Sequence, residues 1–138
     1  LLCLARYAGL RIHECFRMDT ATARQTWEAH AITIKGKGGK TRTVPINETI
    51  AIEMKKMLEL TPPGHKLFVP PGGKTHLEIG RLQQFILRHR RDIQSPEAIP
   101  LTFHGLRYTY AQEQHRQFMA HGLTHRQANQ KVSKLLGH

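Results

Sequence analysis

Apolar side chains recur every three or four residues near the start of the chain, the spacing of an amphipathic helix. They predict a helix over residues 1 to about 17, although Gly9 weakens its middle. Apolar residues then alternate with polar ones in AITIK and TRTVPI, which flank the glycine-rich GKGGK. This pattern predicts a β-hairpin over residues 31–46. A shorter strand is expected at LFVP, residues 67–70.

The remaining segments have helical periodicity and suitable caps. Asn47 is the expected start of one helix, and a second runs from about Leu77 to Ile93 with its arginines outward. Thr102 is expected to cap a third helix ending at His121, and Thr124 a fourth. The expected buried positions are Ile50, Met54, Met57 and Leu58, then Leu82, Phe85 and Ile86, then Phe103, Leu106 and Tyr110, and last Ala128, Val132 and Leu135. The predicted fold class is α+β, mostly helical, with a small antiparallel β-sheet near the N-terminus.

Charge changes this picture of an ordinary globular domain. The 138 residues contain 21 Lys and Arg against 10 Asp and Glu, a formal net charge of +11. This excess predicts a polyanionic partner, with nucleic acid as the first choice and an anionic membrane surface as the second. The sequence has no apolar run long enough for a spanning helix and no secretory leader, so we expect an intracellular protein. Cys3 and Cys15 are expected to be reduced core residues.

The polar residues that could take part in binding or catalysis fall in short motifs. His104 and Arg107 in HGLRYTY are three residues apart, so a helix would place an imidazole beside a guanidinium, an arrangement that could grip one phosphate. Arg11 and Glu14 in GLRIHE have the same spacing, which would let the carboxylate orient the guanidinium. His138 follows Gly137 at the expected end of the last helix, where a protonated imidazole is favoured.

A basic turn, KGKGGKTR at residues 35–42, completes these motifs. It could contact the phosphate backbone or deliver an ammonium group into a site, and its spacing is not that of a nucleotide-binding P-loop. Each motif alone is also compatible with a solvated basic surface. His121 and His125 could in principle bind a metal, but Gly122 interrupts the helix between them and a third ligand is not evident, so no metal is expected.

Taken in order, GLRIHE, the glycine-rich basic hairpin before VP, the His104 and Arg107 pair, and the leucine-rich run closing on Gly-His resemble the catalytic domain of tyrosine recombinases, the phage-integrase family. The resemblance implies a metal-free and nucleotide-free reaction on double-stranded DNA. A tyrosine attacks a phosphodiester, forms a 3′-phosphotyrosyl link and releases a 5′-hydroxyl, and the 5′-hydroxyl of a second strand later reverses the step.

The resemblance also implies roles for individual residues. Arg11 and Arg107 would clamp the non-bridging phosphate oxygens and stabilise the transition state. His104 would accept a proton near the tyrosine, His138 would donate a hydrogen bond to the phosphate, and Glu14 would orient Arg11.

Within the hairpin, Lys37 stands between two glycines and matches the family's general acid, which protonates the leaving 5′-oxygen. Lys35 and Lys40 lie close enough to be alternatives for that role. Lys35, Lys40 and Arg42 are expected to contact DNA.

The family's nucleophilic tyrosine lies beyond the position that His138 matches, and the chain ends there. We therefore expect residues 1–138 to be a partial catalytic domain that lacks an N-terminal DNA-clamping domain and the tyrosine segment. Alone it would be monomeric and unable to cleave DNA. The full-length parent would be active, as a tetramer on synapsed DNA in the bacterial cytoplasm near the nucleoid, and most simply as a mobile-element integrase. A type IB topoisomerase and a non-catalytic DNA-binding module are the alternatives.

Overall fold

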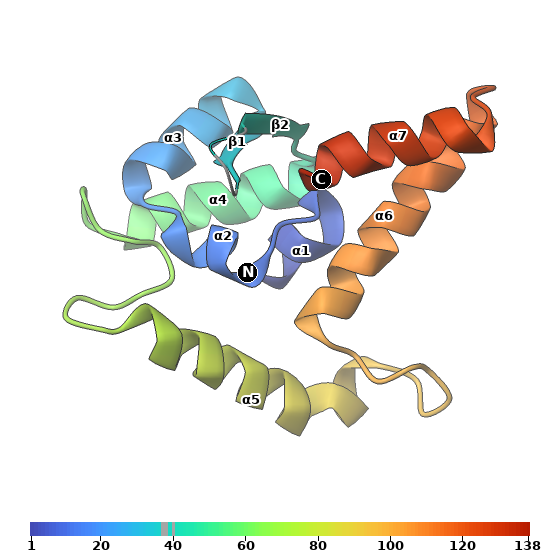
Figure 1. The fold of residues 1–138 in the computed structure, drawn as a ribbon. Coiled ribbons are helices and arrows are strands. Elements are labelled where there is room, and N and C mark those ends of the chain that lie inside the picture. The colour runs from blue at the N-terminus through green and yellow to red at the C-terminus, as the bar shows by residue number, and fades with distance from the viewer. Residues whose placement is uncertain (37–38, 40) are drawn as a thin grey trace.

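The structure is a computed structural model that describes residues 1–36, 39 and 41–138. Helices surround a small β-hairpin (Figure 1). In chain order the elements are α1 (Leu2–Ala8), α2 (Ile12–Arg17), α3 (Thr20–Ala29), β1 (Ala31–Lys35), β2 (Thr41–Pro45), α4 (Glu48–Leu60), α5 (Thr75–Ile93), α6 (Phe103–Ala120) and α7 (His125–Leu136). The expected fold class, mostly helical with a small antiparallel sheet, is confirmed.

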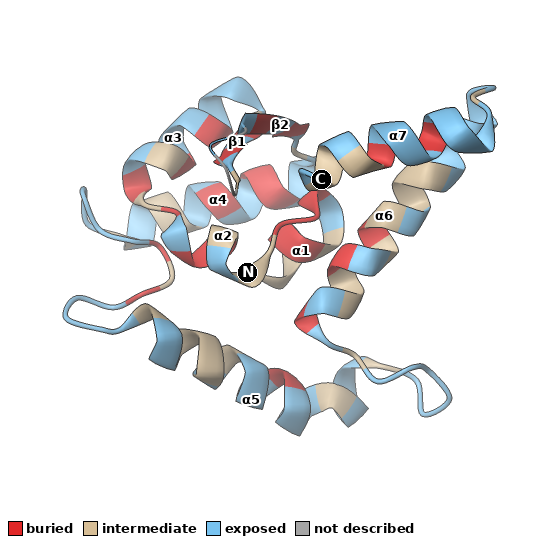
Figure 2. Cartoon of the chain, viewed as in Figure 1, coloured by how far each residue is buried: buried red, intermediate tan, exposed pale blue. Residues whose placement is uncertain are grey.

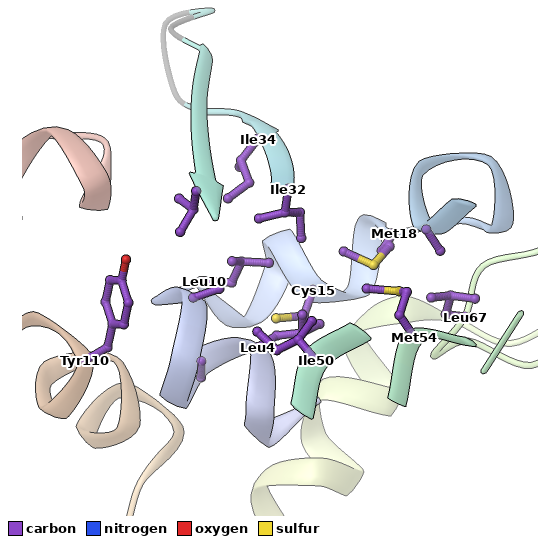
Figure 3. Close-up of a cluster of buried hydrophobic side chains, with 14 of the residues drawn as sticks. Leu4, Leu10, Cys15, Met18, Ile32, Ile34, Ile50, Met54, Leu67 and Tyr110 are labelled. Carbon is purple, nitrogen blue, oxygen red and sulfur yellow. The ribbon is translucent and has the colours of Figure 1, made fainter. Parts of the chain in front are cut away.

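The core lies where α1, α2, the hairpin and α4 meet (Figure 2). Figure 3 shows Ile32 and Ile34 of β1 pointing toward Leu10, with Ile50 of α4 on the other side of the cluster. Cys15 is fully buried in this cluster, and burial raises the pKa of its thiol to about 12. Both cysteines are free thiols, as expected.

The hairpin has the register that alternation predicts. Ile32 pairs with Val44, and Ile34 pairs with Arg42. All four side chains are buried, so they occupy the face of the hairpin that packs on the core. A charged residue therefore lies in a row of apolar ones.

Three of the predicted helix starts are confirmed by their caps. In each case a side-chain oxygen accepts the backbone N–H three residues later, which satisfies a donor that the first helical turn leaves unpaired. The capping residues are Asn47, Thr102 and Thr124. Tyr110 and Phe103 are buried on α6, as the helical stripe predicted.

The predicted first helix is wrong in one respect, because it is broken into α1 and α2. Gly9 adopts a left-handed conformation with φ of +64° and ends α1, and Arg11 is extended before α2 begins. Tyr110 explains why the chain turns here: a Cβ on Gly9 would lie 2.4 Å from Tyr110 Cδ1. The break is therefore a site of close approach between the α1 to α2 corner and α6.

Three smaller expectations also fail. LFVP forms turns instead of a strand, and only an isolated bridge joins Asp19 to the neighbouring Lys66. Phe85 is 51% exposed, because the face of α5 that turns toward the rest of the protein carries Ile79, Leu82 and Ile86 instead. Leu135 is half-buried, while Ala128 and Val132 are buried as expected.

Helix α5 is the most peripheral element of the fold. Figure 1 shows it on one side of the molecule, where it contacts α2. Its Arg81, Arg88 and Arg91 are exposed, as expected, whereas Arg90 is half-buried. Within the described part of the chain, no helix combines the length and the apolar character needed to cross a bilayer.

Candidate active site

The corner between α1 and α2 positions the first arginine. Glu14 reaches back to the start of α2, where its Oε2 accepts the backbone N–H of Arg11 at 2.7 Å. Its Oε1 accepts from Nη1 of the same arginine at 3.2 Å. The carboxylate thus caps the helix and also restrains the Arg11 side chain, which is 31% exposed. The predicted contact between Arg11 and Glu14 is present.

Arg107 of α6 is buried, with an exposed fraction of only 5%. Its Nη1 donates to the carbonyl oxygen of Gly9, and its Nη2 donates to the carbonyl oxygen of Leu136 at 2.8 Å. These carbonyls lie at the C-terminal ends of α1 and α7, where the helix dipoles favour a cation. Burial and the neighbouring Arg11 lower the pKa of Arg107 to about 10, so the guanidinium is still charged at neutral pH.

The end of α7 meets the hairpin at a second glycine. Gly137 is left-handed, with φ of +73°, and a Cβ there would lie 2.8 Å from Nη1 of Arg42. The C-terminal residues of the described chain therefore rest against β2 and against the α1 to α2 corner (Figure 1).

A pocket of about 210 Å³ opens between the α1 to α2 corner, α5 and the start of α6. Arg11, His104 and Arg107 line it together, although the first lies more than ninety positions from the others in the sequence. Gln83 of α5 and His13 of α2 also line it, and Leu10, Ile12 and Phe103 form its apolar wall. His104 is exposed, whereas Arg107 lies beneath it. Two guanidiniums and two imidazoles therefore share one concave surface.

His138 lies near this pocket, but its protonation differs from the expectation. Partial burial lowers the pKa of its imidazole, and the positive charges of Arg11, Arg107 and Arg42 lower it further. The helix C-terminus was expected to favour the protonated form, and that expectation is wrong because burial and three arginines outweigh one helix end. At neutral pH His138 is a neutral hydrogen-bond donor.

The basic side chains of the hairpin lie in different environments. Arg42 was expected to contact DNA, but it is 8% exposed and pairs with Glu14, so its guanidinium faces the interior. Lys35 is exposed and lines a different cavity, of about 370 Å³, together with Glu14 and Arg17. Lys37 and Lys40 lie outside the described residues.

Histidines at the junction of α6 and α7 contact one another. His115 Nε2 and His125 Nδ1 are 3.2 Å apart, and His121 lies against the carbonyl of Gln117. Within residues 1–36, 39 and 41–138, no group of three or more His, Cys, Asp and Glu side chains converges in a way that could hold a metal ion.

The sequence profile of the Phage integrase family matches residues 1–138. The match covers the whole chain, and the chain belongs to this family, the tyrosine recombinases. No protein with a curated function matches the sequence.

The solved structures that are similar to this fold include a recombinase and an integrase. The crystal structure of XerA recombinase superposes with a TM-score of 0.68 at 19% identity, and it matches 99% of this chain and 47% of its own. The integrase of the transposon Tn1549, in complex with transposon right-end DNA, has a TM-score of 0.65 at 19% identity, over 99% of this chain and 49% of its own. The chain thus spans about half the length of these proteins. At this identity the likeness supports the fold of a tyrosine-recombinase catalytic domain.

Sequence reasoning missed two residues that line the pocket and misplaced a third, Arg42, which lies beside it against Glu14. Gln83 and His13 line the pocket because α5 and α2 converge there, a tertiary relation that no local motif signals. The position of Arg42 did carry a signal: it stands two residues before Val44 in a strand, so alternation places both on one face. That face is the buried one.

Proposed function

We propose that residues 1–138 are the phosphate-binding part of a site-specific DNA recombinase that cleaves and rejoins strands through a 3′-phosphotyrosyl intermediate. The observation that carries the proposal is the single pocket in which Arg11, His104 and Arg107 meet. Membership of the Phage integrase family supports the same enzyme class.

In this proposal the two arginines bind the non-bridging oxygens of one phosphodiester. Arg107 is fixed by two backbone carbonyls and Arg11 by Glu14, so neither guanidinium needs extensive reorganisation as negative charge develops. Nη1 and Nη2 of Arg107 each have a second hydrogen that the carbonyls do not use, and Nε has one more. These N–H groups remain as hydrogen-bond donors for the substrate. The pair supplies the charge stabilisation that phosphoryl transfer requires.

Proton movements complete the reaction. The bond between the tyrosine oxygen and phosphorus forms as the bond from phosphorus to the 5′-oxygen breaks. His104 accepts the phenolic proton, and Lys37 gives a proton to the departing 5′-oxygen. His138, neutral at pH 7, donates its N–H to a phosphate oxygen. Lys35 and Lys40 are the alternative donors to the 5′-oxygen and also contact the DNA backbone.

The nucleophile is proposed to lie in a longer protein that contains these residues. Tyr110 is not a candidate because it is 4% exposed and packs against Gly9, and burial raises the pKa of its hydroxyl. Residues 1–138 alone would bind DNA as a monomer without forming a covalent adduct. The parent protein would act as a tetramer on synapsed DNA in the bacterial cytoplasm.

A mobile-element integrase is the specific activity we propose. The similarity to an integrase that was solved with transposon end DNA supports it. The net charge of +11 supports DNA as the substrate.

The test is adduct formation on a nicked DNA duplex that traps the cleaved strand. The longer protein, with its tyrosine, is expected to yield a denaturant-resistant complex, and Arg11→Ala or Arg107→Lys is expected to reduce its rate by at least about a hundredfold. Arg24→Ala, an exposed change on α3, is the control. An adduct formed by residues 1–138 alone would contradict the proposal about the nucleophile. Site-independent relaxation of supercoiled DNA would instead indicate a topoisomerase.

A further inference from the structure

Arg42 forms the most enclosed ion pair among the described residues. Its Nη1 and Nη2 donate to Oε1 and Oε2 of Glu14 at 3.0 and 2.7 Å. The two side chains are only 7% and 6% exposed. This two-point geometry fixes the plane of the carboxylate as well as its position, which a lysine in place of the arginine could not do.

The same carboxylate holds Arg11. Oε2 accepts both the Arg42 guanidinium and the backbone N–H of Arg11, and Oε1 accepts a guanidinium nitrogen from each arginine. Any displacement of Arg42 would therefore rotate the group that orients Arg11 in the pocket.

Arg42 also contacts the segment that carries His138. Gly137 lies so close that a Cβ there would be 2.8 Å from Nη1 and 3.1 Å from Cδ of Arg42. One side chain from β2 thus touches the support of Arg11 and the residue just before His138.

Stability alone does not account for an arginine at this position. Its Nε is buried and has no hydrogen-bond partner in the described part of the chain, and leaving such a donor unpaired is unfavourable. Buried ion pairs as a class are often no more stabilising than apolar side chains of similar size. The neighbouring positions of this face, Val44 and Ile34, are in fact apolar.

We propose that Arg42 is a positioning residue of the phosphate pocket, which orients Arg11 through Glu14 and fixes the approach of His138 through Gly137. The inference rests on the proposed function, because it assigns Arg42 to the same pocket. It also connects the strand that leads out of the basic turn to the groups that bind phosphate.

Sulfate binding to the 138-residue protein tests this role without the tyrosine. Sulfate is a tetrahedral dianion whose charge is constant from acid to neutral pH, and NMR shifts of the pocket residues report its binding at that place. Arg42→Met is expected to raise the Kd for sulfate about tenfold, the equivalent of one charge-assisted hydrogen bond. Arg24→Met, which removes one exposed charge from α3, is the matched control and should change the Kd less than about twofold.

A pH series supplies a readout that a merely structural arginine would not move. Burial pushes the pKa of Glu14 upward, and the hydrogen bond from Arg42 and those from Arg11 more than offset it, so the carboxyl is ionised in the native protein. In Arg42→Met the pKa of Glu14 should rise, and protonation should release Arg11 as the pH falls. The ratio of the two Kd values, Arg42→Met over Arg24→Met, should then grow toward acid pH.

The ratio of the two Kd values excludes any change with pH that is the same in both variants. The charged groups that surround Glu14 are Arg11, Arg17, Lys35, Arg42 and Arg107, and the imidazoles near the pocket are His13, His104 and His138. The titration of His138 is not shared, because Arg42 lowers the pKa of its imidazole. Earlier protonation of His138 in Arg42→Met would strengthen sulfate binding and lower the ratio, so a ratio that grows toward acid pH reports the loss of Glu14 as the support of Arg11.

The outcomes separate the two proposals. If the wild-type chain shows no sulfate shifts in the pocket, the phosphate site itself is wrong. If it binds sulfate and Arg42→Met matches Arg24→Met at every pH, the positioning role is overturned. Should Arg42→Met fail to fold, Arg42→Lys decides: it keeps the charge but loses the two-point contact, and a Kd equal to that of the wild type would refute the role. A fall of about one in the salt slope of DNA binding, relative to Arg24→Met, would show that Arg42 contacts DNA phosphate directly and would also refute it.

Discussion

The inner and outer sides of the proposed phosphate site are built differently. On the inner side, Arg107, Glu14 and Arg42 are buried, and each makes two or more fixed hydrogen bonds. On the outer side, His104 and His138 are exposed, and neither imidazole has a hydrogen bond to another described residue. The inner groups are rigid because the fold depends on them, whereas the outer groups are available to move protons.

This difference implies that one set of residues holds the positive charges in place and another set is free to transfer protons. An interior guanidinium keeps its position before substrate arrives, which is the condition for electrostatic stabilisation without reorganisation. An exposed imidazole is accessible to water, and in the proposed reaction it can accept or donate a proton at the DNA. Substitutions on the inner side should therefore affect both folding and function, and those on the outer side should affect function alone.

Arg107→Ala is expected to have the largest effect on stability. It removes two charge-assisted hydrogen bonds, to the carbonyls of Gly9 and Leu136, and leaves both carbonyls unpaired. The free energy of unfolding, from urea denaturation followed by circular dichroism, should fall by about 4 kcal/mol. Arg88→Ala on the exposed face of α5 should change it by less than about 0.5 kcal/mol. Equal losses in the two variants would mean that the inner arginine does not support the fold.

Gly9→Ala should have the next largest effect and lower the free energy of unfolding by about 3 kcal/mol. The left-handed backbone disfavours any Cβ, and this Cβ would also overlap the Tyr110 ring. Gly122→Ala separates the two causes, because Gly122 has a φ of +85° and no described atom lies within 4 Å of the place that a Cβ would occupy. It should lose only about 1 kcal/mol, and a comparable loss at Gly9 would show that the ring moves aside freely.

Acidification should lower the free energy of unfolding by less than these two substitutions do, because it neutralises the Glu14 carboxylate without removing the side chain. The pKa of Glu14 is lowered by Arg42 and Arg11 despite its burial. Its contribution to stability is therefore complete above the unfolded pKa and is lost as the pH falls through the lower folded value. Glu14→Gln should be less stable at neutral pH and should show a shallower decline in melting temperature toward acid. A decline as steep as that of the wild type would assign the acid sensitivity to other carboxyl groups.

His138→Ala should have the smallest effect on stability, within about 0.5 kcal/mol, because the side chain lies on the outer side. NMR titration of His138 should give a pKa below the ordinary value of 6.5. Since the folded state favours the neutral ring, any stability it contributes is complete above the unfolded pKa and declines as the pH falls through the folded one. Arg11→Ala should move this pKa upward, and an unchanged value would mean that Arg11 does not act on the imidazole.

Much of this arrangement could be predicted from the sequence, because its signals are local. Alternation indicated the hairpin, capping residues indicated the helix starts, and the spacing of Arg11 and Glu14 indicated their contact. The break at Gly9 could not be predicted from propensity, since a glycine alone only weakens a helix, and the close approach of Tyr110 depends on tertiary packing.

The pKa shifts and the buried ion pair were harder to predict from the sequence than the fold. The lowered pKa of His138 comes from its partial burial and from arginines on three other segments, so no property of the last helix predicts it. The burial of Arg42 was encoded in the strand alternation, but a basic turn beside it favoured the interpretation of the whole stretch as a DNA contact. The role of Arg42 therefore depends on the face of the strand on which it lies.

The two carbonyls bound by Arg107 have a consequence for the order of folding. One belongs to Gly9 and the other to Leu136, so the bonds of this arginine span 98 residues toward the start of the chain and 29 toward its end. Contacts this distant in sequence form late, because the chain between them must first be ordered. During synthesis the guanidinium cannot be fixed until Leu136 has been added and α7 has docked. A growing chain would therefore acquire its folded core before Arg107 is held by both of its carbonyls.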